Sequence, residues 1–249
     1  MTTPVLDMSE VAPGIIKLTM QDRQHKNMFS DALITALIDA FAKLRARTDC
    51  RVAILTGYDT YFSSGGTLGA LQSMQEGRGT FVDTNLYSLA LGCEIPVIAA
   101  MQGHGIGGGL VLGLFADFVV LSRESVYAAN FMNYGFTPGM GATYILPHRL
   151  GFNIAQEMLM TGSGFRGEEL AARGVTLPVV PRSEVMPYAL ALAREIADKP
   201  RIALTTLKAH LTRAVRAGVE AVIRDELGMH AITSHQPEVR ERIQQRFGL

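Results

Sequence analysis

One stretch limits the possible folds of this chain more than any other: residues 95–115, with the sequence IPVIAAMQGHGIGGGLVLGLF. Pro96 begins a short apolar run that predicts a buried strand, and the glycines between positions 103 and 109 predict a tight turn into a small apolar helix. A strand that turns through glycines into a helix leaves backbone N–H groups unpaired at the helix start. Such groups bind a phosphate, or stabilise the negative oxygen that develops on an acyl carbonyl. The sequence therefore predicts an anion-binding turn here.

Composition and charge narrow the class of protein. Hydrophobic residues make up 48% of the 249, which is enough for a substantial core. The 23 basic and 23 acidic residues cancel, so no charge pattern indicates a nucleic-acid partner. Cys50 and Cys93 fit a reducing cytoplasm better than a disulfide framework. No export signal is visible, and no apolar run reaches the ~18 residues of a membrane span. We expect a cytoplasmic protein without a membrane segment.

Hydrophobic periodicity predicts strands and helices in alternation over the first two thirds of the chain. Strands are expected at 14–20, 52–55, 118–121 and 126–131. Helices are expected from an N-cap at Ser30 to about Arg47, and at 152–160, 166–173, 184–197, 202–215 and 219–233. A polar, glycine-containing loop is expected at 72–84, and the turn FSSGG (62–66) is a second place where a strand leads through glycines toward a helix.

The first glycine turn has three possible roles. Gly103, Gly105 and Gly108 spell G-x-G-x-x-G, the pattern of a dinucleotide site. The helix that follows ends before Asp117, which is too short for a Rossmann crossover with its carboxylate ~20 residues further on. A turn that only packs helix against strand is the second possibility. The third uses both turns, because N–H groups at Ser64-Gly65 and Gly107-Gly108 that converge on one oxygen form an oxyanion hole.

The motifs FSSGG, IPVIAAMQGHGIGGG and TPGMGAT resemble those of the crotonase (enoyl-CoA hydratase/isomerase) superfamily, and the resemblance covers nearly the whole chain. It implies an α/β fold, a spiral of ββα turns with a C-terminal helical trimerisation region. On this basis residues 1–190 form the spiral core with the oxyanion hole. Residues 191–249 form a helical region for oligomerisation and active-site cover. The assembly implied is a trimer or a hexamer.

The resemblance also assigns site residues. The backbone N–H groups of Ser64 and Gly108 would form the oxyanion hole for a thioester, and the loop with His25 and Lys26 would hold a pantetheine-bearing substrate. Hydratases carry two catalytic glutamates, at positions where this chain has Val111 and Phe131. Since a hydratase needs a positioned carboxylate to handle water, ordinary hydration is excluded.

The strings QGHGIGGG and SVYAANFMNYGFTPGMGAT are similar to a narrower subgroup, the decarboxylating hydratase-like enzymes of polyketide β-branching (HMG-synthase) cassettes. These act on 3-methylglutaconyl groups carried by acyl carrier protein. The resemblance implies a carboxy-lyase that gives a 3-methylcrotonyl-type product. The sequence has no H-E-x-x-H or C-x-x-C spacing that would indicate a metal site, and the resemblance implies no cofactor beyond the carrier's phosphopantetheine.

Physical chemistry is consistent with that reaction. Loss of CO2 from a glutaconyl thioester leaves a dienolate whose charge rests on the thioester oxygen, where an oxyanion hole stabilises it. Dry apolar walls at Val111 and Phe131 would disfavour the charge of the departing carboxylate. No base is required for this step, but one acid must then protonate the carbanion.

His230 is the expected acid. It lies on an apolar helical stripe with Val219, Ile223 and Leu227, and related decarboxylases carry a functional histidine in this E-L-x-x-H context. Glu226, one turn earlier, is expected to hold it protonated. A buried structural histidine is the alternative.

Other basic residues have weaker signals. His104, inside the glycine turn, either bonds the turn or lies near the substrate, while His148 and His210 are expected on the surface and His235 at a helix end. Residues 68–79 contain no lysine, unlike some relatives, and Arg78 is the base there that would bind the substrate carboxylate.

Two further functions stay open. The same oxyanion hole could serve a thioester hydrolase or enoyl isomerase with His230 or His104 as base. A chain without its carboxylates could also be a non-catalytic scaffold that only binds a partner.

Overall fold

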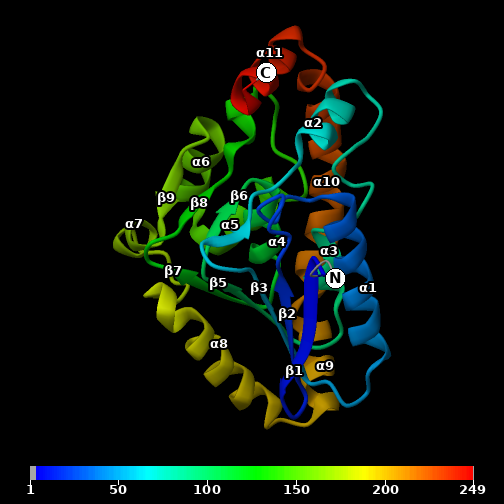
Figure 1. Ribbon diagram of the computed structural model, residues 1–249, viewed down its shortest axis with the longest axis vertical. Coiled ribbons are helices and arrows are strands. Elements are labelled where there is room, and N and C mark those ends of the chain that lie inside the picture. Colours follow the sequence, from blue (N-terminus) through cyan, green and yellow to red (C-terminus); the bar gives the residue numbers. More distant parts are fainter. Residues whose placement is uncertain (1–3, 249) are drawn as a thin grey trace.

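The computed structural model describes residues 4–248 and contains two β-sheets (Figure 1). The larger sheet has the strand order β1-β2-β3-β5-β7-β10. Its strands span Leu6–Ala12, Ile15–Met20, Val52–Thr56, Val97–Met101, Phe118–Ser122 and Val179–Val180. The β1–β2 pair is antiparallel and the later pairs are parallel. Parallel neighbours require crossover connections, and those connections carry the site.

The smaller sheet has the order β4-β6-β8-β9, with strands at Tyr61–Ser63, His104–Ile106, Val126–Ala128 and Gly164–Arg166. Each of its first three strands follows a strand of the larger sheet and leads into a helix. These helices are α2 (Leu68–Gln75), α4 (Gly108–Leu114) and the 3-10 helix η1 (Asn130–Tyr134). The unit of two strands and a helix thus repeats three times, which confirms the predicted ββα spiral.

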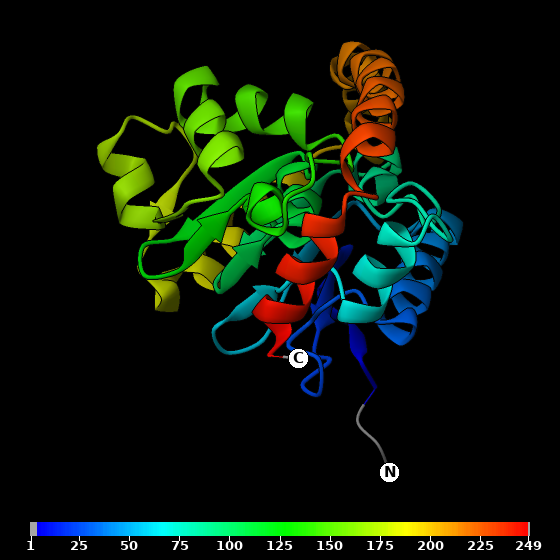
Figure 2. The same ribbon diagram turned by 90° about the horizontal axis from the view of Figure 1, so that it is seen from above.

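Helices cover both faces of the larger sheet (Figures 1 and 2). In β3, Val52 and Ile54 belong to the cluster under α8 (Arg182–Ala197), whereas Ala53 and Leu55 belong to the main core. This alternation follows the two-residue period of a strand. The main core also includes the buried stripes of α1 (Asp31–Ala46), α3 (Ser88–Gly92) and α5 (Ala142–Leu150). The central strands are nearly continuous hydrophobic runs because both faces of the larger sheet are covered by apolar side chains.

The remaining helices are α6 (Phe152–Thr161), α7 (Gly167–Ala172), α9 (Arg201–Leu211), α10 (Arg213–Thr233) and α11 (Pro237–Phe247). The expected boundary at residue 190 falls inside α8, which packs on the sheet, so the helical region beyond the sheet starts with α9. Both ribbon views place α11 beside α2 (Figures 1 and 2). The end of the chain therefore returns to the elements that carry the glycine turns.

Several local predictions are confirmed and others are wrong. Ser30 caps α1, its Oγ accepting from Leu33 N at 3.2 Å. Phe131 lies in η1 rather than in a strand, and α2 extends into the expected loop as far as Gln75. The strands β1, β6, β9 and β10 were not predicted, and β6 falls inside the expected glycine turn.

The break expected near Gly218 is also wrong. The chain breaks at Thr212, and α10 runs straight through Gly218. A Cβ at Gly218 would lie 2.6 Å from the Tyr144 ring of α5. The glycine is therefore needed for close packing of two helices and does not end one.

Within residues 4–248, no helix is long and apolar enough to cross a membrane. Cys50 and Cys93 are both buried free thiols, and burial raises the pKa of each.

Candidate active site

The structure brings the two glycine turns together. The turn after β4 carries Ser64 and Gly65, and a Cβ on Gly65 would lie 3.5 Å from the backbone nitrogen of Gly108 at the start of α4. Ser64, Gly65 and Gly108 all line one cavity of about 490 Å³. Two backbone segments from separate spiral turns therefore face the same space, as an oxyanion hole requires.

Backbone geometry explains why glycines occupy these turns. Gly65 has a φ of +81° and Gly107 a φ of +55°, which L side chains rarely adopt. Gly107 N donates to Ala128 O at 2.7 Å and so ties the start of α4 to β8. Gly108 is the first residue of α4, and an N–H in the first turn of a helix has no partner within the helix. The Gly108 N–H is thus a donor that a ligand can use.

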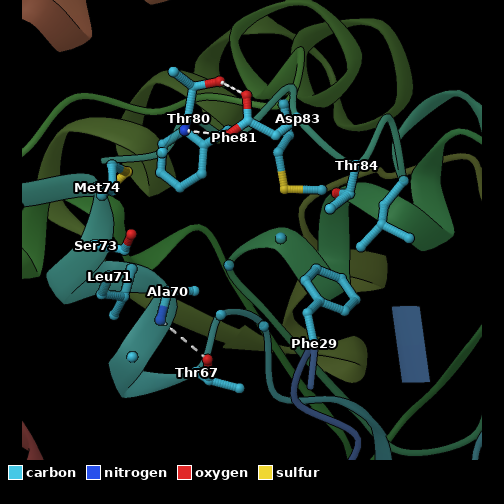
Figure 3. Close-up of a pocket in the computed structure, with 18 of the residues that line it drawn as sticks. Phe29, Thr67, Ala70, Leu71, Ser73, Met74, Thr80, Phe81, Asp83 and Thr84 are labelled. Atoms are coloured by element: carbon cyan, nitrogen blue, oxygen red, sulfur yellow. Dashed lines mark hydrogen bonds between the residues drawn. The ribbon is translucent and has the colours of Figure 1, made fainter. Parts of the chain in front are cut away.

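The walls of the cavity are mostly apolar. Figure 3 shows Phe29 on the side opposite Thr80 and Phe81, with Leu71 and Met74 of α2 along a third side. Phe131 and Phe136 also line the cavity, whereas Val111 is fully buried in the core inside α4. Of the two positions that hold glutamates in hydratases, position 131 therefore faces the cavity, and it carries the phenyl ring of Phe131. A positioned carboxylate for activating water is missing at that point.

The loop between α2 and α3 forms the wall that carries Thr80 and Phe81. Asp83 accepts from Thr80 N at 2.7 Å and from Thr80 Oγ1 at 2.6 Å, and these two bonds lower the pKa of Asp83 (Figure 3). Arg78 also lines the cavity, but its guanidinium is exposed and pairs with Glu76. Arg78 thus lies at the rim, where it can meet an incoming anion only in competition with Glu76.

His230 lies on the buried stripe of α10, as its spacing predicts, and is 6% exposed. It lines a second cavity of about 170 Å³, and the Phe81 ring stands edge-on to the imidazole at 4.4 Å between centroids. Burial is the main cause that lowers its pKa to about 4, so the imidazole is neutral at pH 7. Among residues 4–248, no hydrogen-bond partner reaches its Nε2 atom.

The expectation that Glu226 holds His230 protonated is wrong. The Glu226 carboxylate accepts from Gly141 N at 2.7 Å, from Thr143 N at 2.9 Å and from Thr143 Oγ1 at 2.6 Å. It therefore caps the start of α5, where orphan N–H groups need an acceptor, and is drawn away from the imidazole. Burial raises the pKa of Glu226, and these three bonds oppose that effect.

Glu226→Gln is expected to destabilise the fold. A carboxylate accepts from all three donors, but an amide turns its NH2 toward at least one N–H and leaves that donor unpaired. The expected loss is about 1–3 kcal/mol in the free energy of unfolding, measured by urea titration. Glu220→Gln on the exposed side of the same helix is the control and should change stability by less than about 0.5 kcal/mol. Equal losses in both variants would contradict the capping role.

The structure places the other predicted residues outside the main cavity. His25 bonds Asp22 at 2.9 Å and lines a shallow outer groove of about 410 Å³, which shares Asp31, Thr67 and Gly69 with the main cavity. Lys26 is exposed, with its ammonium 5.8 Å from the centre of the Tyr61 ring. The outer groove thus adjoins the main cavity.

Of the two roles left open for His104, the geometry favours the structural one. Its Nδ1 accepts from Val126 N at 2.9 Å and so joins β6 to β8. His148 and His210 are exposed, as expected, and His235 Nδ1 bonds Gln75 O at 2.8 Å near the end of α10.

Sequence reasoning missed most of the apolar lining residues, among them Phe29, Phe81, Phe136 and Met140. Phe29 and Phe81 lie outside the quoted motifs, and nothing in the motif that contains Phe136 and Met140 marks these two as lining residues. The approach of Met140 Sδ to within 2.7 Å of an ideal Cβ on Gly108 is visible only in the folded chain.

Comparison with known proteins agrees with this geometry. The family model described as enoyl-CoA hydratase/isomerase matches residues 10–247. The bacillaene synthase decarboxylase PksI of Bacillus subtilis (strain 168) is 56% identical over 248 residues, which is 100% of both chains. Carnitinyl-CoA dehydratase of Salmonella enteritidis is 34% identical over 201 residues, covering 78% of this chain and 75% of that protein.

Two solved structures are close to this one. A structure from a dehydratase/decarboxylase enzyme couple involved in polyketide β-branching superimposes with a TM-score of 0.96 at 56% identity, over 98% of this chain and 100% of that one. The ECH2 decarboxylase domain of CurF from Lyngbya majuscula gives a TM-score of 0.94 at 46% identity, with the same coverage. This chain therefore belongs to the enoyl-CoA hydratase/isomerase family.

Proposed function

We propose that this protein decarboxylates a 3-methylglutaconyl thioester on the phosphopantetheine of an acyl carrier protein, giving a 3-methylcrotonyl-type product in polyketide β-branching. One observation carries the proposal: beside the paired turns, the cavity has Phe131 where a hydratase needs a carboxylate. The two similar decarboxylases, PksI and the CurF domain, support it. No metal or further cofactor takes part in this proposal.

The oxyanion hole drives the bond cleavage. The thioester oxygen binds between the N–H groups of Ser64 and Gly108, and the bond between the carboxylate and the γ-carbon breaks. The electron pair of that bond passes through the double bond to the thioester oxygen, so CO2 leaves and a dienolate remains. Preorganised N–H donors stabilise this charge where it develops, and each is worth about 10²–10³ in rate.

The apolar walls assist the same step. Phe29 and Phe131 line the cavity and offer no hydrogen bond to a substrate carboxylate placed beside them. A carboxylate without its water shell is disfavoured relative to a neutral CO2 molecule and a dienolate whose charge is hydrogen-bonded. Arg78 at the rim is proposed to attract the carboxylate into the cavity.

His230 is proposed to deliver the proton that completes the reaction. Its imidazole is neutral in the free protein, but a substrate carboxylate beside it raises its pKa. The imidazole then takes up one proton from solvent and gives it to the dienolate carbon. One proton is consumed for each CO2 released, so the reaction is balanced without a second acid.

The outer groove is proposed to hold the pantetheine arm. It shares Asp31, Thr67 and Gly69 with the cavity, and His25 lines it. An arm lying there would lead from the carrier protein at the surface to the oxyanion hole. Lys26 is exposed at the same loop and supplies a positive charge for the acidic surface or phosphate of a carrier.

The mass of the acyl chain on a loaded carrier protein tests the function. After incubation of 3-methylglutaconyl-carrier protein with the enzyme, we expect the acyl group to lose the mass of CO2 while the thioester survives. Loss of the whole acyl group would indicate a hydrolase, and an unchanged mass with a moved double bond an isomerase. A fully unchanged carrier would indicate a scaffold. Each of these three results would overturn the proposal.

We also propose that the working form is a trimer-based oligomer, with no stable folded monomer at micromolar concentration. The C-terminal helices expose large apolar side chains that a monomer would leave in water: Ile202 (74%), Leu211 (65%) and Ile232 (71%). Sedimentation velocity at micromolar concentration is expected to show a trimer or hexamer. A well-folded monomer would contradict this.

A further inference from the structure

His230 lines a small cavity that lies next to the substrate cavity. The main cavity and the smaller cavity at His230 share Met74, Gly79, Thr80 and Phe81 in their walls. The Phe136 ring of the main cavity lies 5.3 Å from the imidazole between ring centroids, and the Phe81 ring lies closer, at 4.4 Å. The same ring lies 6.2 Å from Phe131 and 5.9 Å from Phe136 of the main cavity. Of the Phe81 and Phe136 rings, Phe81 is the one that lines both spaces, and it forms the partition between them with Phe136 beside it.

A notch in the backbone holds this ring in place. Gly139, in the T-P-G turn before α5, has no side chain, and the three atoms nearest to an ideal Cβ there all belong to the Phe81 ring. A methyl group at this position would overlap the ring, while the φ of Gly139 is not in the left-handed region. The missing side chain at Gly139 is what lets Phe81 close against His230.

The backbone segment that carries Phe81 makes only local hydrogen bonds. Thr80 and Asp83 bond each other, and Asn85 N donates to Val82 O at 3.1 Å. Within the described chain, the hydrogen bonds of residues 80–83 go to that segment or to Asn85, and Thr80 and Asp83 are exposed. Phe81 can thus move without breaking a hydrogen bond to the core.

We propose that Phe81 is a gate whose ring, in the position seen here, separates His230 from the substrate and whose displacement joins the two cavities into one site. The proposal rests on the proposed function, since it gives His230 a partner in the main cavity. Closed, the ring keeps the imidazole dry. Displaced, it lets the imidazole reach the acyl chain at the carbon that needs a proton. Phe81 is thus a positioning residue that acts through His230.

Four variants test the gate: Phe81→Ala, Gly139→Ala, the double variant and, as control, Gly228→Ala. Gly228 lies two residues before His230 on α10, and within residues 4–248 an added methyl there meets no atom within 4 Å. The first readout is the pH midpoint of the His230 ring signals by NMR. Two other ionisable groups lie near His230. His235 lowers its pKa, and the Glu226 carboxylate is bound by Gly141 and Thr143. Neither residue is substituted in any of the four variants.

Opening the gate wets the imidazole and raises its midpoint. We expect Phe81→Ala and Gly139→Ala each to raise the midpoint by at least about one pH unit, because burial is its main depressing cause. The double variant should match Phe81→Ala alone, since the methyl at position 139 has no ring left to displace. Gly228→Ala should match the wild type. Unchanged midpoints in the first two variants, or additive shifts in the double one, would overturn the gate.

A second readout joins the gate to the substrate. The probe is 3-methylcrotonyl-pantetheine with a methylene in place of the thioester sulfur, at saturating concentration. Its binding should move the His230 ring signals in the wild type, and an absence of movement would overturn the gate. The mass assay on wild-type protein is run beside it. If the wild type decarboxylates the carrier but the His230 signals do not move on binding the probe, the gate is wrong and the proposed function stands. If the His230 signals move but no decarboxylation occurs, the gate stands and the proposed function is wrong.

Discussion

Gly108→Pro is expected to lower the rate of decarboxylation by about 10²–10³-fold, because it removes one of the two N–H groups that stabilise the dienolate. Position 108 begins α4, and proline is tolerated at the first position of a helix, so the fold should survive. The measurement is kcat at saturating acyl-carrier protein, with circular dichroism to check the fold.

Gly108→Ala is the matched control. Any Cβ at this position meets Met140 Sδ at 2.7 Å and Phe29 Cε2 at 2.9 Å, so both variants share the crowding that a Cβ causes. Only the proline variant lacks the N–H, and its ring Cδ stands where that hydrogen pointed. A much smaller loss in the alanine variant assigns the effect to the hydrogen bond. Equal losses would mean that Gly108 matters for space alone, and the oxyanion assignment would be wrong.

His230→Gln is expected to fold and to lose at least about 10²-fold in product formation, in the range that general acid catalysis contributes. Glutamine has a similar volume, but it cannot take up a proton when the substrate carboxylate arrives. The alternative is a structural histidine, for which activity per folded molecule would stay nearly intact while the melting temperature fell. Both quantities are measured on one preparation.

The same variant tests the burial of His230 through the pH dependence of stability. The folded-state pKa of about 4 lies below the ordinary value near 6.5, so between these values the unfolded chain binds more protons. The contribution of His230 to stability is therefore complete above about pH 6.5 and is lost as the pH falls through about 4. In His230→Gln the acid-side slope of the unfolding free energy should be shallower. An identical slope would mean that the imidazole is hydrated in the folded state.

Local signals in the sequence predicted much of the fold. The N-cap at Ser30, the buried strand β3 and the glycine turn into α4 each depend on residues next to one another, so their patterns are readable along the chain. The buried position of His230 followed from helical spacing alone. The closeness of the turns at Ser64 and Gly108 could be predicted because both turns have the same strand–glycine–helix pattern.

Contacts between distant segments could not be predicted in this way. Glu226 and His230 are one helical turn apart, which suggested a pair, but Gly141 and Thr143 bind the carboxylate from 85 and 83 positions away. Phe81 was part of an expected polar loop, and its place against His230 depends on the empty space at Gly139. Arg78 was expected to bind the substrate, yet Glu76 two residues before it takes its guanidinium. Each case is a choice between partners that only the folded chain brings together.

The most direct test of the central claim is a single turnover of 3-methylglutaconyl-carrier protein in heavy water (D2O), followed by the intact mass of the carrier. If the paired N–H groups drive decarboxylation and an acid then protonates the carbanion, the acyl group loses CO2 and gains one deuterium on carbon, and Gly108→Pro slows both changes equally. An acyl group that keeps its carboxylate and gains the mass of water would contradict the account, because it would show that the cavity activates water without a carboxylate at position 131.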